Sequence, residues 1–175
     1  NGFNEHVFPL EYWSKHIAAT PGTDRLNKIS IGIEIVSLGK LTKTDKGWIA
    51  WTGKVIPENE IADPYTVDDN NNIVKLAKGY RYVNKFNVQE RFQKYTPEQI
   101  STVKSLIIDL KTKFNIPVYL NKTNYKELFP KANSKSKMAM DGQPGIYTHC
   151  SYRTDKSDIL PQKEILEMLM EIGSL

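Results

Sequence analysis

The stretch ISIGIEIVS, residues 29–37, decides the predicted fold because it is the clearest strand signal in the chain. β-branched residues occur throughout it, and its isoleucines alternate with the other residues, which is typical of a strand. Apolar residues occur in both alternating sets, so both faces of the strand would carry apolar side chains. We therefore expect residues 29–37 to form a central strand of a sheet.

Glu34 is the only charged residue of this predicted strand. A buried carboxylate is costly unless it is paired, and Gly32 would leave open space beside Glu34 on the same face. Two interpretations follow. Glu34 is either a general base at a site or a structural carboxylate bonded to backbone or to an arginine.

Two helices are predicted on the C-terminal side of this strand. Thr96-Pro97-Glu98-Gln99 carries an N-cap, a proline at the first helical position and a capping-box glutamine. Apolar residues follow at helical spacing up to Phe114, and Asn115-Ile116-Pro117 ends the helix. A second amphipathic helix is expected from Pro161 to Ile172, with one apolar stripe: Ile165, Leu169 and Ile172.

Residues 39–94 read as a hairpin or loop region inserted between the strand and the first helix. Polar turns at 44–47 and 68–72 flank strand-like pieces at 48–56 and 79–86. The region also carries four large aromatic residues that either stack on sugar rings or peptides or cover the core: Trp48, Trp51, Tyr80 and Tyr82.

The stretch GIYTHCSYRTDKSD, residues 145–158, concentrates groups that ligate metals or titrate. Residues 146–148 are predicted to form a short strand that ends at His149, and Lys156 and Asp158 would point the same way in an extended loop. Imidazole and carboxylate are ordinary Zn²⁺ ligands, and a lysine beside the metal would stabilise a developing oxyanion. The alternative is a solvated loop with weak surface ion pairs. A Cys150 nucleophile is less favoured, because His149 would point to the opposite face of a strand.

Composition narrows the possible classes of protein. A chain of 175 residues, 39% hydrophobic and 25% charged, is typical of one soluble globular domain, and no apolar run is long enough to span a bilayer. The net charge of +4 is spread along the chain, so we expect neither a nucleic-acid nor a membrane partner. The single cysteine excludes an internal disulfide and leaves the compartment open.

Five segments, in order, resemble the zinc-dependent N-acetylmuramoyl-L-alanine amidases, the family that includes phage lysozyme-amidases and peptidoglycan recognition proteins. They are Trp13 with His16; the stretch NKISIGIEIV at 27–36; Tyr95-Thr96 with Gln99; Ile116-Pro117; and His149 with Lys156-Ser157-Asp158.

This resemblance implies a single α/β domain over residues 1–175, with a central mixed β-sheet flanked by helices. It implies a Zn²⁺ ion held by His149 and Asp158, a general base at Glu34, a lysine near the scissile carbonyl at Lys156, and a substrate pocket lined by Trp13 and His16. The reaction would be hydrolysis of the N-acetylmuramoyl-L-alanine amide in peptidoglycan, in a secreted, periplasmic or phage-delivered setting. A non-catalytic peptidoglycan-binding module is the alternative.

The resemblance supplies only two metal ligands, whereas catalytic zinc usually has three protein ligands and a water. We therefore expect the domain to lack its N-terminal strand. An upstream segment or a companion chain would add that strand and the remaining histidine.

Overall fold

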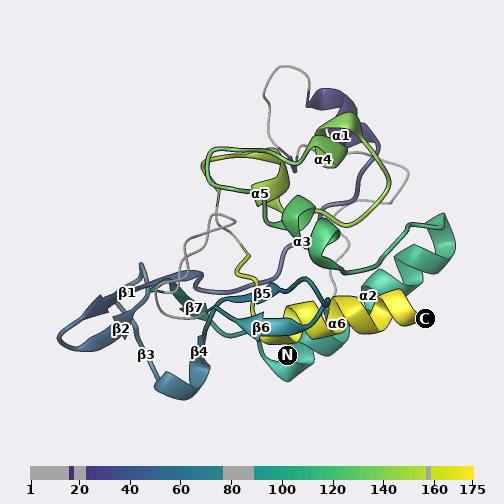
Figure 1. Ribbon diagram of the computed structural model, residues 1–175. Helices are drawn as coiled ribbons and strands as arrows, with labels where there is room; N and C mark the ends of the chain where they lie inside the picture. Colours follow the sequence, from purple (N-terminus) through teal and green to yellow (C-terminus); the bar gives the residue numbers. More distant parts are fainter. Residues whose placement is uncertain (1–15, 18–22, 77–88, 157–158) are drawn as a thin grey trace.

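The computed structural model describes residues 16–17, 23–76, 89–156 and 159–175 (Figure 1). It combines helices with antiparallel sheets, which agrees with the predicted α/β class. In Figure 1 the sheets and two long helices fill the lower half of the view, and four short helices gather above them: α1 (Asp24–Lys28), α3 (Lys122–Leu128), α4 (Lys137–Asp141) and α5 (His149–Tyr152).

The larger sheet has five short strands in the order β3-β2-β1-β7-β4, and every neighbouring pair is antiparallel. The strands are β1 (Lys40–Thr44), β2 (Gly47–Ile49), β3 (Val55–Ile56), β4 (Ile61–Ala62) and β7 (Arg91–Gln93), with a 3-10 turn, η1, at Glu58–Glu60 before β4. Tight turns join β1, β2 and β3, and such turns produce antiparallel pairs, whereas parallel pairs need long crossovers. The predicted mixed sheet therefore differs from the pairing found among the described strands.

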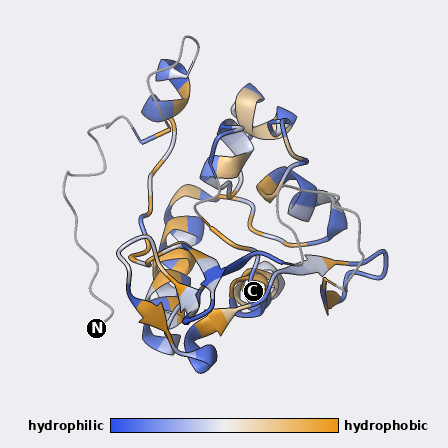
Figure 2. Cartoon of the chain, turned by 90° about the vertical axis from the view of Figure 1, so that its left-hand side faces the viewer, coloured by the Kyte–Doolittle hydropathy of each residue, from blue (hydrophilic) through white to orange (hydrophobic). Residues whose placement is uncertain are grey.

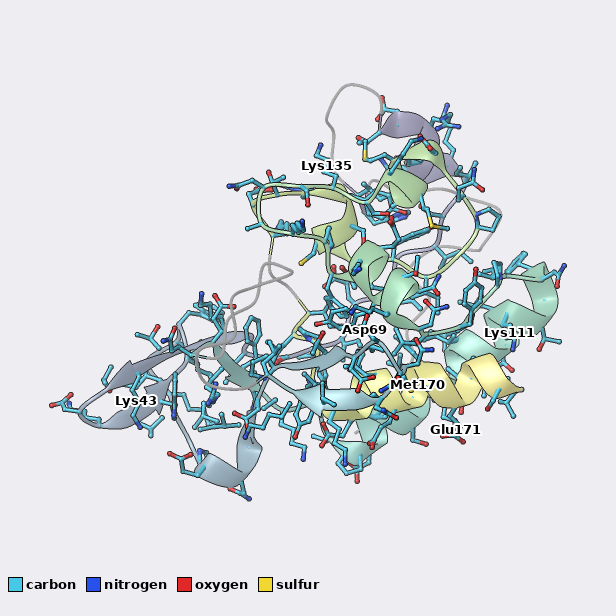
Figure 3. All side chains as sticks on the ribbon, viewed as in Figure 1. Lys43, Asp69, Lys111, Lys135, Met170 and Glu171 are labelled. Carbon is cyan, nitrogen blue, oxygen red and sulfur yellow. The ribbon has the colours of Figure 1, made fainter. Side chains whose placement is uncertain are left out.

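The predicted turn at 44–47 is confirmed as the tip of the β1–β2 hairpin. The Thr44 hydroxyl donates to the Gly47 carbonyl at 3.1 Å, and the Lys46 amide donates to Thr44 Oγ1 at 3.2 Å. Gly47 has φ +112°, a left-handed value that favours glycine. The neighbouring Lys43 lies on this hairpin (Figure 3).

The aromatic residues of this hairpin have different environments. Trp48 is half-buried beside a small core of Leu41, Ala50 and Ile56, and the Lys43 and Arg91 cations lie 5.3 and 5.7 Å from its ring. Trp51, in the next turn, is 82% exposed. Trp48 therefore covers the sheet and Trp51 does not. Tyr80 and Tyr82 lie outside the described residues.

The predicted turn at 68–72 is also confirmed. It joins β5 (Tyr65–Val67) to β6 (Ile73–Lys75), an antiparallel pair. Asp68 Oδ1 accepts the amides of Asn70 and Asn72 at 2.9 and 2.7 Å. These bonds, led by that of Asn72, lower the pKa of the Asp68 carboxyl.

Helix α2 (Pro97–Phe114) begins and ends where the sequence predicts. The Thr96 side chain accepts the Gln99 amide at 3.3 Å, and Gln99 Oε1 accepts the Thr96 amide at 2.9 Å, so the capping box is complete. Asn115 then takes the left-handed conformation, with φ +51°, and stops the helix.

Helix α6 (Lys163–Ser174) buries the predicted stripe, since Ile165, Leu169 and Ile172 are all at most 5% exposed. Helix α2 packs mainly against α6. Near the end of α6, the Lys111 ammonium group donates to the Ile172 carbonyl at 2.9 Å (Figure 3). This helix pair forms much of the main core, together with Phe92, Tyr125 and Phe129.

Residues 29–37 do not form the predicted central strand. They run as irregular chain from α1 towards the sheet, and Figure 2 shows hydrophobic and hydrophilic residues alternating along this segment. Near the end of this segment, Gln99 Nε2 donates to the Val36 carbonyl at 2.7 Å, and the amide of the following Leu38 donates to Gln93 Oε1 at 2.9 Å.

The prediction failed because a strand needs a paired neighbour as well as β-branched residues. The structure pairs residues 31–35 with no other backbone among the described ranges. Ile29 is 59% and Val36 86% exposed, so the expected burial on both sides is wrong.

The short helices pack on one another through specific contacts. Arg25 of α1 donates to the Asp141 carbonyl at the end of α4, at 3.4 Å. Asn121 caps α3 by accepting the Asn124 amide at 2.9 Å. None of the helices in the described ranges has the length and apolar character needed to cross a membrane.

Candidate functional site

His149 is the first residue of α5. The three residues before it are irregular, so the predicted strand at 146–148 is wrong. The turn is tied to the end of α3 by two hydroxyl groups: Thr148 donates to the Leu128 carbonyl at 2.6 Å, and Ser151 donates to the Glu127 carbonyl at 2.8 Å. Ser151 Oγ also accepts the Thr148 amide at 3.2 Å. These bonds fix where His149 starts its helix turn.

The His149 imidazole contacts the predicted pocket segment directly. Its Nε2 lies 2.7 Å from the His16 carbonyl oxygen. A carbonyl can only accept, so Nε2 carries the proton. In the neutral ring the lone pair is then on Nδ1. A backbone carbonyl that orients the other ring nitrogen is a common arrangement behind a metal-binding histidine.

His16 is itself held by Asn27, at the end of α1. Asn27 is fully buried, and its Oδ1 accepts the backbone amides of both His16 and Ile17, at 3.1 and 2.9 Å. Its Nδ2 donates to the Thr23 carbonyl at 3.3 Å. One amide side chain therefore joins residues 16 and 17 to the end of α1.

The His16 ring bonds to Ser30. His16 Nε2 lies 2.8 Å from Ser30 Oγ, and Ser30 Oγ lies 2.6 Å from the Leu26 carbonyl. Because the single hydroxyl proton goes to the carbonyl, Nε2 of His16 must be the donor in the first bond. The sequence interpretation did not identify Asn27 or Ser30 as site residues. The sequence feature that could have identified them is a pair of short polar residues at a helix end, because such side chains hydrogen-bond to backbone groups there.

Gly32 makes the close approach of the His16 ring possible. A Cβ atom at Gly32 would lie 2.9 Å from both Cβ and Cγ of His16, which is too short for any real contact. The open space predicted beside Gly32 is therefore filled by His16. Glu34, two residues further on, is exposed, so its predicted burial is wrong.

The loop after α5 contains the predicted lysine. Lys156 is half-buried, and its carbonyl accepts the Cys150 thiol at 3.2 Å. Arg153 and Asp155 form a two-bond ion pair at 3.0 and 2.7 Å. The Arg153 guanidinium lowers the pKa of the exposed Asp155 carboxyl to about 2.

Cys150 is completely buried, with 0% exposure. A nucleophilic cysteine needs access to substrate and an environment that favours the thiolate. The burial of Cys150 and its bond to a carbonyl argue against the cysteine-hydrolase interpretation.

Several predicted site residues lie outside the described ranges: Trp13 and Asp158. Of the predicted metal pair, only His149 is described. Within the described ranges, no group of three metal-ligating side chains occurs. The described donors alone therefore do not make a complete zinc site.

Searches of family models, of curated proteins and of solved structures found no match to this chain.

Proposed function

We propose that this chain is a zinc-dependent N-acetylmuramoyl-L-alanine amidase acting on peptidoglycan. One observation carries the proposal: three segments that the resemblance assigns to one site lie together. The His149 imidazole bonds to the His16 carbonyl at 2.7 Å, and the His16 ring lies against Gly32, in the stretch that carries Glu34. Segments so far apart in the sequence are expected to meet at a site if each contributes to it.

The chain's own residues take these roles in the proposal. His149 and Asp158 hold the metal, and the His16 carbonyl, which accepts the Nε2 proton of His149 at 2.7 Å, orients that imidazole ring. Glu34 takes a proton from the attacking water, and Lys156 stabilises the negative charge on the substrate oxygen. Zinc, when bound, would acidify that water and polarise the amide carbonyl. His16 and Trp13 line the substrate pocket.

The exposure of Glu34 is compatible with this role, because a general base must reach a water and a substrate.

The proposal is tested by measuring bound zinc by mass spectrometry and the release of L-alanine amino termini from purified peptidoglycan. The parent protein should bind zinc and release peptides. His149→Ala should lose both properties, whereas Glu167→Gln, a change at an exposed position on α6, should keep them. A parent protein supplied with zinc that releases no peptide would refute the amidase proposal.

A non-catalytic peptidoglycan-binding module is the second candidate. The observation that favours it is the lack of a three-donor metal group among the described side chains. Such a module would sediment with insoluble peptidoglycan in the presence of a chelator and release no peptide. An amidase would release peptide, and chelation would stop that release.

A further inference from the structure

A cavity separate from the His149–His16 contact lies beside α3. It is bounded by α3, the segment 117–119 and the loop 144–147, with Met138 and Leu169 closing its sides. The cavity has a volume of about 30 Å³ and opens to solvent. Its lining combines polar and apolar groups, and no lysine, arginine or histidine is among the residues that line it.

Asn124 lines this cavity and has a buried polar atom without a partner. Its Oδ1 makes no hydrogen bond to any part of the chain that the structure describes. The cap of α3 does not need this side chain, because Asn121 accepts the Asn124 amide. A buried acceptor without a donor is rare in proteins and calls for an explanation such as a bound group.

Glu127 follows Asn124 by three residues, so both side chains lie on the same face of α3. Its Oε2 accepts the Ser136 hydroxyl, and the Met138 amide at 3.4 Å. Its other carboxylate oxygen has no hydrogen-bond partner within the described residues. The lining therefore presents a carboxylate oxygen as an acceptor, with no lysine, arginine or histidine among the lining residues.

Tyr147 supplies a third oxygen. Burial, followed by the charge of Glu127 and the proximity of Tyr119, raises the pKa of its phenol, so the hydroxyl stays protonated at neutral pH. Its position depends on Gly145, where a Cβ atom would lie 3.2 Å from the Tyr147 hydroxyl oxygen.

We propose that this cavity binds a primary ammonium group carried on a short aliphatic stem. Asn124 Oδ1, the second carboxylate oxygen of Glu127 and the Tyr147 hydroxyl are acceptors for the donors of an ammonium group, and the apolar side chains of the lining contact the stem. An ammonium group has three donors and no acceptor, which matches this set of oxygens. The site does not depend on the proposed amidase activity.

The same chemistry occurs in a lysine side chain of a peptide and in a free alkyl diamine. The test titrates the protein with Nα-acetyl-lysine amide, with 1,5-diaminopentane and with Nα-acetyl-norleucine amide, which lacks the charge. Nuclear magnetic resonance follows the amide signals of α3 and of residues 144–147. Saturable shifts with either amine support the site, and the one that binds more tightly identifies the source of the group.

Two variants locate the interaction. Glu127→Gln keeps an acceptor for Ser136 and should weaken amine binding by about tenfold or more, because a bond to a charged group is lost. Tyr147→Phe should weaken it less and serves as a second test if Glu127→Gln does not fold. Glu167→Gln, on the exposed face of α6, is the matched control and should bind as the parent does.

Two results would overturn the proposal. One is equal binding of the norleucine derivative, which would make the cavity simply apolar. The other is no saturable shift with either amine, which would leave ordered water as the partner of Asn124.

Discussion

Replacing Gly32 by alanine tests the packing of the candidate site directly. The added Cβ would lie 2.9 Å from His16 Cβ and Cγ, and the position of Cβ is fixed by the backbone, so side-chain rotation cannot relieve that contact. Overpacking of this kind costs about 1–3 kcal/mol, and a glycine-to-alanine change returns about 0.4–1 kcal/mol by restricting the unfolded chain. Displacing His16 also weakens its bonds to Ser30 and His149. We expect a net loss of about 1–2 kcal/mol in the free energy of unfolding.

Urea denaturation measures this loss. With a slope of about 2 kcal/mol per molar urea, the midpoint of Gly32→Ala should fall by about 0.5–1 M. The imidazole nitrogen signals of His149 should also move, because its acceptor is the His16 carbonyl.

A double-mutant cycle with His16→Ala provides the control. That change removes the ring but keeps Cβ, so part of the clash should be relieved and the two substitutions should couple. A Gly32→Ala variant more stable than the parent, with unchanged histidine signals, would refute the described contact between Gly32 and His16.

Four further results are expected. Asn124→Leu should raise the free energy of unfolding in urea by about 1 kcal/mol, because it removes a buried acceptor without a donor; a loss of stability would give Asn124 a structural role. Glu34→Gln should keep fold and zinc and lower amide hydrolysis by about 10²-fold, and a loss within about threefold would remove Glu34 as the base. Lys156→Ala should lower kcat more than it raises KM, with Lys46→Ala as control, whereas an unchanged kcat with weaker binding would make Lys156 a substrate-holding residue. The pKa of Asp155 is lowered to about 2, so Asp155 contributes stability that is present above its unfolded pKa and is lost as the pH falls through about 2. Asp155→Asn should abolish that part of the acid dependence of stability. A titration of the Asp155 carboxyl near its ordinary value would contradict the ion pair with Arg153.

Features set by a few neighbouring residues were predictable from the sequence. The capping box of α2, the left-handed Asn115 and the turns at 44–47 and 68–72 depend on residues within one turn of each other. The apolar stripe of α6 was predictable for the same reason, because its spacing is visible without knowledge of what covers it.

Features that depend on a partner elsewhere were not predictable. The alternation in residues 29–37 shows which residues favour a strand, but not whether a neighbouring strand is available. The short strand predicted before His149 failed in the same way, because Thr148 and Ser151 bond to α3 and draw the chain into a helix turn.

The residues of the candidate site also differ in whether the sequence could predict them. His16 and His149 were identified from their residue types, and the structure brings them together. Asn27 was not identified, because its role is to accept the amides of His16 and Ile17, which lie outside α1, and nothing in its neighbouring residues specifies those donors.

The complete burial of Cys150 makes this cysteine a natural probe of local opening in the protein. A thiol with 0% exposure cannot meet a maleimide or a disulfide reagent until α5 opens. The slow labelling rate, divided by the rate for a free thiol at the same pH, gives the equilibrium constant for that opening when reclosing is fast. Since Cys150 is the only cysteine in the chain and follows His149 directly, this rate follows the local unfolding of the candidate site without any engineered label.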